Sequence, residues 1–178
     1  MVKVVIGDVG YGKSYYVNNL LKQTDSHSFV VGRDNYEESG KIKNFDWEEI
    51  KSLLEHIRAA LTLNEDFTVV FEMAGSTLNE SDPLNVKEDE KSELFELLIH
   101  GEVIVVAQTV EDVPEGLDNI EEYIFFKQNI TNERKSLVAL FGRTVNDIEG
   151  SRDFLSNIGS LDIGEYVSYK KEWVAKAN

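Results

Sequence analysis

Five short apolar runs, rich in β-branched and aromatic residues, constrain the fold of this chain more than any other feature. Because they do not alternate between apolar and polar residues, they are typical of strands buried on both faces, as in a parallel sheet. A further short strand is expected at Tyr166–Tyr169, just after Gly164. The five runs are Val2–Ile6, Phe29–Val31, Phe67–Phe71, Val103–Ala107 and Tyr123–Phe126.

Segments with helical periodicity alternate with these runs. One begins after Asp46, a good N-cap with Glu49 three residues later, and another begins after Asn85, with Glu88 three residues later. Their apolar faces consist of Trp47, Ile50, Leu53, Leu54, Ile57 and Leu61 in the first helix and Leu94, Leu97 and Leu98 in the second. Strands alternating with helices predict an α/β fold with three layers, α/β/α, around a mostly parallel sheet.

The remaining stretches complete this expected organisation. Further helices are predicted after residues 13, 131 and 151, and the polar stretches 33–45 and 74–85 are predicted to be loops. The second of these loops directly follows the third strand, where α/β folds place ligand-binding segments.

Composition suits an ordinary globular protein, but the charge is unusual. The chain has 178 residues, which favours a single domain over 1–178, and it has no cysteine, which excludes disulfides and Cys-ligated metal sites. We find neither an apolar run long enough to cross a membrane nor a signal peptide, so a cytoplasmic location is expected. The formal net charge of −15 repels nucleic acid at long range. A nucleic-acid function would therefore depend on local basic groups such as Lys41, Lys43 or Lys87.

Residues 7–14, GDVGYGKS, match the phosphate-loop pattern GxxxxGK[ST]. The glycines allow close backbone approach, so that successive N–H groups can surround a phosphate. Lys13 is expected to reach the β- and γ-phosphates of ATP, and the Ser14 hydroxyl to bind Mg²⁺. The match lies between a predicted strand and a predicted helix, which favours a P-loop NTPase with a RecA-like core over a chance glycine-rich turn. The expected nucleotide contacts are Gly7, Asp8, Val9, Gly10, Tyr11, Gly12, Lys13, Ser14 and Tyr15.

Glu72 ends the third apolar run, where hydrolysis requires a carboxylate that positions Mg²⁺ or polarises water. Many phosphate-loop ATPases carry Asp-Glu here, whereas this chain has a lone Glu72. If Glu72 is on the metal side, the catalytic base comes from elsewhere, with Glu80 and Asp82 as candidates. If Glu72 is the base, Mg²⁺ relies on Ser14, phosphates and water. A helix cap or a solvated strand-end acid is the non-functional alternative.

Gln108 follows the fourth run and is a candidate polar sensor. If this strand lies between the phosphate-loop strand and the Glu72 strand, the Gln108 amide faces the γ-phosphate and can sense it or orient water. The alternative is a polar residue that only caps the following turn.

These features together resemble the FtsK–HerA superfamily of DNA-pumping ATPases. The similarity covers about residues 1–170, and within the superfamily it is greatest for viral genome-packaging ATPases. It rests on Gln108-Thr109 with the following Glu111-Asp112-Val113-Pro114, on Asn119 and the strand Tyr123–Phe126, and on the ending Phe154-Leu155, Leu161 and Gly164-Glu165-Tyr166-Val167.

The resemblance implies an oligomeric ring, often a hexamer, that hydrolyses ATP to drive double-stranded DNA into a capsid. Capsid or membrane-vertex proteins would be its partners, in the host cytoplasm or the virion. Such rings complete each site with an arginine from the neighbouring subunit, because a cation there stabilises developing charge. Arg143 is the expected residue, with Arg134 and Arg152 as further candidates and Arg33 and Arg58 less favoured.

Two alternative functions are compatible with the same phosphate loop. A small nucleoside or nucleotide kinase would use an acceptor-site acid such as Asp34, but it gives no role to the Gln108 block. A nucleotide-binding regulator with weak turnover would explain the missing Asp-Glu pair.

Overall fold

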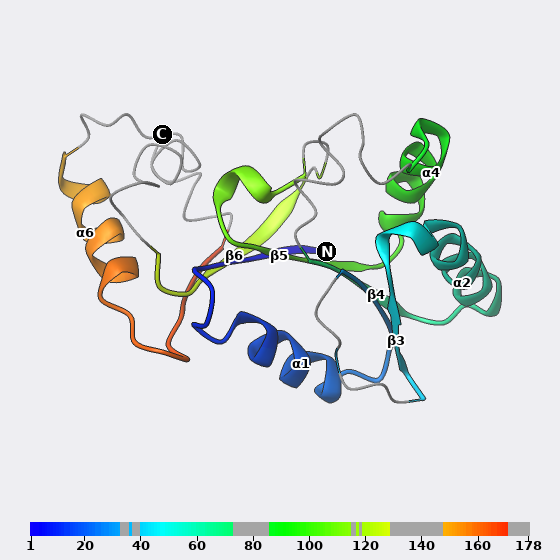
Figure 1. The fold of residues 1–178 in the computed structure, drawn as a ribbon, viewed down its shortest axis with the longest axis horizontal. Helices are drawn as coiled ribbons and strands as arrows, with labels where there is room; N and C mark the ends of the chain where they lie inside the picture. Colours follow the sequence, from blue (N-terminus) through cyan, green and yellow to red (C-terminus); the bar gives the residue numbers. More distant parts are fainter. Residues whose placement is uncertain are drawn as a thin grey trace.

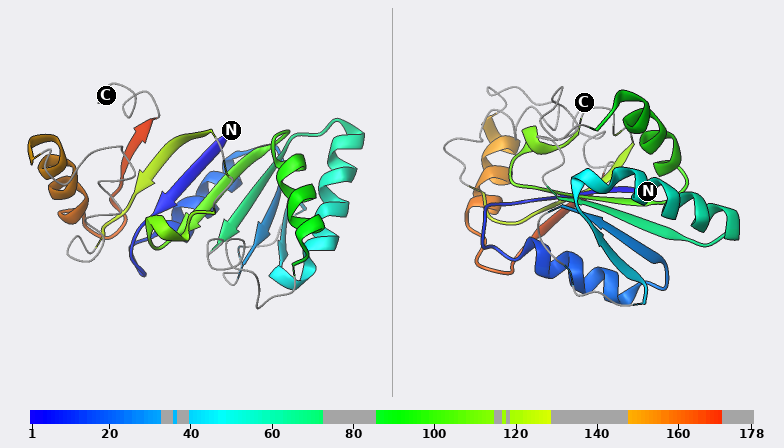
Figure 2. Two further views of the ribbon diagram at one scale, coloured as in Figure 1. Left: turned by 90° about the horizontal axis from the view of Figure 1, so that it is seen from above. Right: turned by 45° about the vertical axis from the view of Figure 1, so that its right-hand side comes forward.

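A twisted seven-stranded sheet forms the centre of the computed structural model, which describes residues 1–32, 36, 40–72, 86–114, 117, 119–128 and 148–170 (Figures 1 and 2). The strands lie in the order β3-β2-β4-β5-β1-β6-β7. All neighbouring pairs are parallel except β6 and β7, which are antiparallel. The strands are β1 (Val2–Ile6), β2 (His27–Val31), β3 (Ile42–Phe45), β4 (Phe67–Glu72), β5 (Glu102–Ala107), β6 (Ile120–Phe125) and β7 (Val167–Lys170).

Helices cover both faces of the sheet, which confirms the predicted three-layer α/β/α fold. Helix α1 lies under one face, and α2 and α4 lie over the other (Figure 1). Helix α6 packs into the same apolar cluster as α2 and α4. The helices are α1 (Lys13–Gln23), α2 (Ile50–Leu63), α4 (Glu88–Leu98) and α6 (Ile148–Gly159), with short 3₁₀ turns η1 (Trp47–Glu49) and η2 (Val110–Asp112). Among the described residues, no helix is both long and apolar enough to cross a bilayer.

The non-alternating runs are buried on both faces, as their composition predicts. In β1, Val4 belongs to the apolar cluster on the side of α2 and α4, and its neighbour Val5 belongs to the cluster that α1 covers. Neither side chain is exposed to solvent. Burying an aliphatic side chain of this size contributes about 1.5–3 kcal/mol, so each residue of the central strands stabilises one of the two layers.

Strand β3 is a correction to the sequence-based expectation, because it lies inside the stretch 33–45 that was predicted to be a loop. Among the strands that the structure describes, it lies at the sheet edge and pairs with β2 alone. Ile42 and Phe45 are buried, whereas Lys43 between them is exposed. A four-residue edge strand with only two buried residues carries too few apolar residues to form a recognisable run.

Helix boundaries also differ slightly from expectation. The N-cap of α4 is Lys87 rather than Asn85, and the backbone N–H of Lys87 donates to the Glu90 carboxylate at 3.4 Å. Helix α6 begins at Ile148, earlier than predicted. The helix expected after residue 131 and the loop expected at 74–85 lie outside the described residues, as does Asn85 itself.

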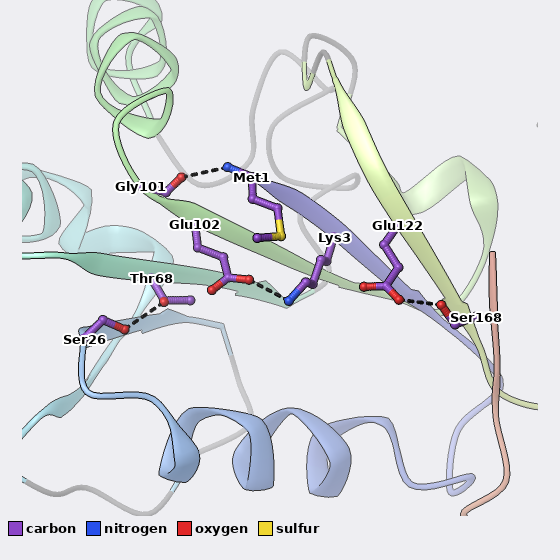
Figure 3. A network of polar contacts seen from close by, with 8 residues as sticks. All are labelled: Met1, Lys3, Ser26, Thr68, Gly101, Glu102, Glu122 and Ser168. Carbon is purple, nitrogen blue, oxygen red and sulfur yellow. Dashed lines mark hydrogen bonds and ion pairs between the residues drawn. The ribbon is translucent and has the colours of Figure 1, made fainter. Parts of the chain in front are cut away.

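At the amino-terminal ends of the strands, polar side chains pair across the sheet (Figure 3). The Lys3 ammonium lies 2.8 Å from a Glu102 carboxylate oxygen, linking β1 to β5. Farther along the strands, the Ser168 hydroxyl donates to Glu122 at 2.5 Å, linking the antiparallel β7 to the middle of β6. The functional groups predicted from sequence gather instead at the opposite, carboxyl-terminal ends of the parallel strands β1, β4 and β5.

Candidate functional site

The phosphate loop leaves β1 at Gly7 and leads into α1. Gly10 and Gly12 have φ angles of +86° and +100°, in the left-handed region that favours glycine. The loop is fixed between two neighbouring strands, because Gly7 N–H donates to the Ala107 carbonyl at 3.2 Å and Asp8 N–H donates to the Lys127 carbonyl at 2.9 Å. Helix α1 begins directly after Gly12, so its positive dipole end faces the space that the loop encloses. This cradle fits a phosphate group.

Lys13 carries the positive charge of the loop. Its ammonium donates to the carbonyls of Gly7 at 2.5 Å and Asp8 at 2.9 Å, so the side chain folds back along the loop. The ammonium is therefore held at the mouth of the cradle, beside the backbone groups that would surround a phosphate.

Ser14 and Glu72 come together although they lie on different elements. The Ser14 hydroxyl is 3.4 Å from Oε1 of Glu72, which stands at the end of β4 and is only 5% exposed. A buried carboxylate next to a hydroxyl supplies the hard oxygen ligands that Mg²⁺ prefers. The pair therefore fits this ion, whereas a solvated strand-end acid would be exposed.

Strand β5 lies between β1 and β4, which is the arrangement required for Gln108 to face the phosphate loop. Gln108 follows β5 directly and lines the same cavity, of about 410 Å³, as Lys13, Ser14 and Glu72. Of the described residues, those that line the cavity are Val9, Gly10, Gly12, Lys13, Ser14, Tyr15, Glu72, Val106, Ala107 and Gln108. The sheet thus brings three separate sequence signals to one cavity.

Two side chains hold the backbone around Gln108: Asp112, which belongs to the segment on which the sequence resemblance rests, and Gln128, which the sequence interpretation did not single out. Asp112 Oδ2 accepts the N–H groups of Gln108 at 3.2 Å and of Thr109 at 2.9 Å. From the segment that follows β6, the Gln128 amide donates to the Gln108 carbonyl at 2.9 Å, and Gln128 is only 2% exposed. Gln128 belongs to no sequence motif. Its contact with Gln108 therefore becomes visible only from the order of the strands in the sheet.

Tyr36 is a second residue without a sequence signal. Its hydroxyl donates to Oε1 of Glu72 at 2.5 Å, and the side chain is buried. It lies in the stretch predicted to be a loop, thirty-six positions from its partner. The pairing follows from β2 and β4 being neighbours in the sheet.

The turn before β7 also packs against the phosphate loop. Gly164 N–H donates to the Tyr11 carbonyl at 3.1 Å. Tyr166 lies against Tyr16 of α1, with 4.9 Å between ring centroids. Burial raises the pKa of Tyr16, with smaller contributions from Tyr166 and Glu122, so the Tyr16 hydroxyl stays protonated at neutral pH. Tyr16 is thus a packing residue, whereas Tyr15 is 73% exposed and lines the cavity.

Several predicted residues lie elsewhere. Arg58 forms an ion pair with Glu93, away from the residues that line the cavity. Lys41 pairs with Asp25 at 2.9 Å, and the Lys43 ammonium lies 2.9 Å from His56 Nε2. Arg33, Asp34, Glu80, Asp82, Arg134 and Arg143 lie outside the described residues, as does the side chain of Arg152.

No protein-family model and no curated protein matches the sequence. Solved structures share its fold. The genome packaging NTPase B204 of Sulfolobus turreted icosahedral virus 2, in complex with AMPPCP, aligns with a TM-score of 0.69 and 13% identity over 97% of this chain and 93% of that chain. The DNA-packaging ATPase B204 of Sulfolobus turreted icosahedral virus aligns with a TM-score of 0.62 and 15% identity, over 97% of this chain and 93% of that chain. EssC (ATPases 2 and 3) of Geobacillus thermodenitrificans aligns with a TM-score of 0.58 and 16% identity, over 95% of this chain and 37% of that chain.

These similarities confirm the predicted P-loop NTPase fold, and they bear out the predicted resemblance to genome-packaging ATPases at the level of the fold. At 13–16% identity, the likeness to these three structures concerns the fold.

Proposed function

We propose that this chain is a Mg²⁺-dependent ATPase that moves double-stranded DNA, with packaging of a viral genome into a capsid as its output. It acts as a single domain over residues 1–178 within a ring, often a hexamer, in the host cytoplasm or the virion. Capsid or membrane-vertex proteins are its further partners. The observation that carries the proposal is the convergence of the phosphate loop, Glu72 and Gln108 on one cavity.

The residues of the cavity have separate roles in this proposal. The loop N–H groups and the Lys13 ammonium bind the phosphates of ATP. The Ser14 hydroxyl and the Glu72 carboxylate hold Mg²⁺, which neutralises phosphate charge when it is bound. The 3.4 Å contact between them favours the metal-side role for Glu72 over the role of catalytic base. Gln108 then orients the attacking water, and Arg143 of a neighbouring subunit stabilises the developing charge.

The similar structures support the choice of substrate. B204 was solved with AMP, with ATP-gammaS and with AMPPCP, and it is described as a genome packaging NTPase. The likeness to B204 extends over 97% of this chain. The net charge of −15 restricts DNA contact to local basic groups, for which Lys41, Lys43 and Lys87 remain the candidates.

Phosphate release from Mg-ATP, with and without double-stranded DNA, tests the proposal when light scattering measures the assembly in the same samples. We expect hydrolysis that DNA stimulates, in a ring-sized particle. Lys13→Ala should weaken nucleotide binding by roughly ten- to a hundredfold, because a hydrogen-bonding charge is lost, with unchanged circular dichroism. Glu72→Gln should abolish hydrolysis. Lys22→Ala, which removes a lysine from the far end of α1, is the matched control and should leave both unchanged.

Three results would contradict the proposal in different ways. Normal ATP binding by Lys13→Ala would refute the assignment of the phosphate loop. Transfer of phosphate to an added nucleoside or nucleotide by a small particle would replace the motor with a kinase. Hydrolysis that DNA leaves unchanged at low salt would refute DNA as the substrate.

A further inference from the structure

We propose that Tyr36 is a positioning residue, which orients the Glu72 carboxylate toward Ser14 and so sets the affinity of the site for Mg²⁺. The inference rests on the proposed function, because it assigns Glu72 to the metal. Tyr36 does not line the cavity and acts only through its contact with Glu72.

The hydroxyl groups of Tyr36 and Ser14 contact the same carboxylate oxygen of Glu72. Oε1 accepts the Tyr36 hydroxyl at 2.5 Å and lies 3.4 Å from the Ser14 hydroxyl. Two partners on one oxygen fix the rotation of the carboxylate about its final bond. Because Glu72 is only 5% exposed, water competes little for these contacts, and a hydrogen bond to a charged group is strong there.

Tyr36 is itself held in place from the sheet edge. Its backbone N–H donates to Asn44 Oδ1 at 3.3 Å, and Asn44 Nδ2 donates to the Tyr36 carbonyl at 2.9 Å. The Tyr36 side chain belongs to the apolar cluster that includes Val30, Val70 and Val106. The phenol hydroxyl therefore reaches Glu72 from a fixed position, through two reciprocal bonds to β3 and a packed ring.

The chain leaving β2 restricts Glu72 on another side. Gly32 has a φ angle of +149°, and a Cβ built on it would lie 2.6 Å from the Glu72 Cβ. The Glu72 stem is thus packed against Gly32 while its carboxylate is held by Tyr36. Gly32 and Tyr36, which both lie between β2 and β3 in the sequence, therefore act together as an outer support for the carboxylate.

A ring packed for stability alone does not require this hydroxyl. Phenylalanine would fill the same apolar space, whereas only tyrosine places a donor on Oε1. Outer hydrogen bonds that orient carboxylate ligands typically change metal affinity or activity by 10- to 100-fold when they are removed. The effect of the Tyr36 hydroxyl on Mg²⁺ affinity can therefore be separated from the effect of its ring on stability.

The test is the Mg²⁺ dependence of nucleotide binding, measured with a fluorescent ATP analogue rather than by turnover. Tyr36→Phe should raise the Mg²⁺ concentration for half-maximal effect by roughly 10- to 100-fold, with binding in EDTA unchanged. Tyr16→Phe is the matched control, because it removes a phenol hydroxyl from a ring packed against the same cluster without contact to Glu72. An unchanged Mg²⁺ dependence in Tyr36→Phe would overturn the inference.

A double mutant shows whether Tyr36 acts through Glu72. Combined with Glu72→Ala, Tyr36→Phe should have no further effect on the Mg²⁺ dependence, whereas additive effects would overturn the inference. Should Tyr36→Phe fail to fold, Asn44→Ala loosens the same residue from β3 and should raise the Mg²⁺ requirement in the same direction. An unchanged requirement in that variant would again overturn the inference.

The outcomes also separate this inference from the proposed function. Failure of the wild-type protein to bind the analogue, or equal binding by Lys13→Ala, contradicts the nucleotide site itself. A different result contradicts only the role of Tyr36. In that case the Mg²⁺ dependence of binding is lost in Glu72→Ala but is the same in Tyr36→Phe as in the wild-type protein.

Discussion

Replacing Gly32 by alanine should damage the protein far more than its position at a strand end suggests. The φ angle of +149° is one that residues with a side chain rarely adopt, and the new Cβ would meet the Glu72 Cβ at 2.6 Å and its Cα at 3.4 Å. Because the second contact involves backbone of the buried strand β4, the strand cannot move aside without disturbing its neighbours β2 and β5.

The expected loss of stability combines two terms. Holding a non-glycine residue in such a backbone conformation costs about 1–3 kcal/mol. Forcing an extra carbon into a packed region costs about 1–3 kcal/mol more. Gly32→Ala should therefore lower the free energy of unfolding by about 2–6 kcal/mol, a large part of the 5–15 kcal/mol that is typical of domains.

Urea denaturation followed by circular dichroism measures this loss. Gly40→Ala is the matched control, because no atom of the described residues lies within 4 Å of a Cβ built on Gly40, and its φ angle is not positive. That substitution should be neutral or stabilising by about 0.4–1 kcal/mol, since alanine restricts the unfolded chain. If Gly32→Ala unfolds at the same urea concentration as Gly40→Ala, the packing of Gly32 against Glu72 is wrong.

Three further predictions concern the support of the cavity and the core. Gln128→Met removes the donor to the Gln108 carbonyl, so ATP hydrolysis should slow. The free energy of unfolding, measured by urea titration, should change by only about 1 kcal/mol. A normal rate of hydrolysis would mean that the Gln108 backbone needs no such support. Asp112→Ala removes the acceptor of two N–H groups at the start of η2 and should cost about 0.5–2 kcal/mol in the same titration. Leu53→Ala, in the unexposed core of α2, should cost about 2–5 kcal/mol, whereas Leu63→Ala, at a position that is 67% exposed, should stay within about 0.5 kcal/mol; similar losses for both would contradict the described burial.

The sequence predicted those elements whose local pattern and tertiary environment agree. The run Val2–Ile6 followed by GDVGYGKS predicted both the inner strand β1 and the loop after it. Burial on both faces and the phosphate-loop glycines each leave a local pattern in the sequence. The relation of Gln108 to Glu72 could be stated only as a condition on strand order, which the sheet satisfies.

Residues that depend on long-range pairing were missed. Tyr36 and Gln128 belong to no motif, and their partners become neighbours only when β2 meets β4 and β6 lies near β5 across β1. Strand β3 was missed because Lys43 and Asn44 interrupt its apolar pattern, although pairing with β2 determines its conformation. The proposed roles of Arg143, Glu80 and Asp82 remain sequence predictions.

The position of β1 inside the sheet, between β5 and β6, has a consequence for synthesis of the chain on the ribosome. Val4 of β1 lies opposite Val105 of β5 and Tyr123 of β6, so both partners of this apolar strand are translated long after it. At roughly 5–20 residues per second, β1 waits roughly 5–20 s for its first partner. An unpaired apolar strand is prone to aggregate during that interval, and pairing between distant segments is slow. We therefore expect the nascent chain to depend on chaperones until β5 and β6 have emerged, and the nucleotide cradle to form only after them.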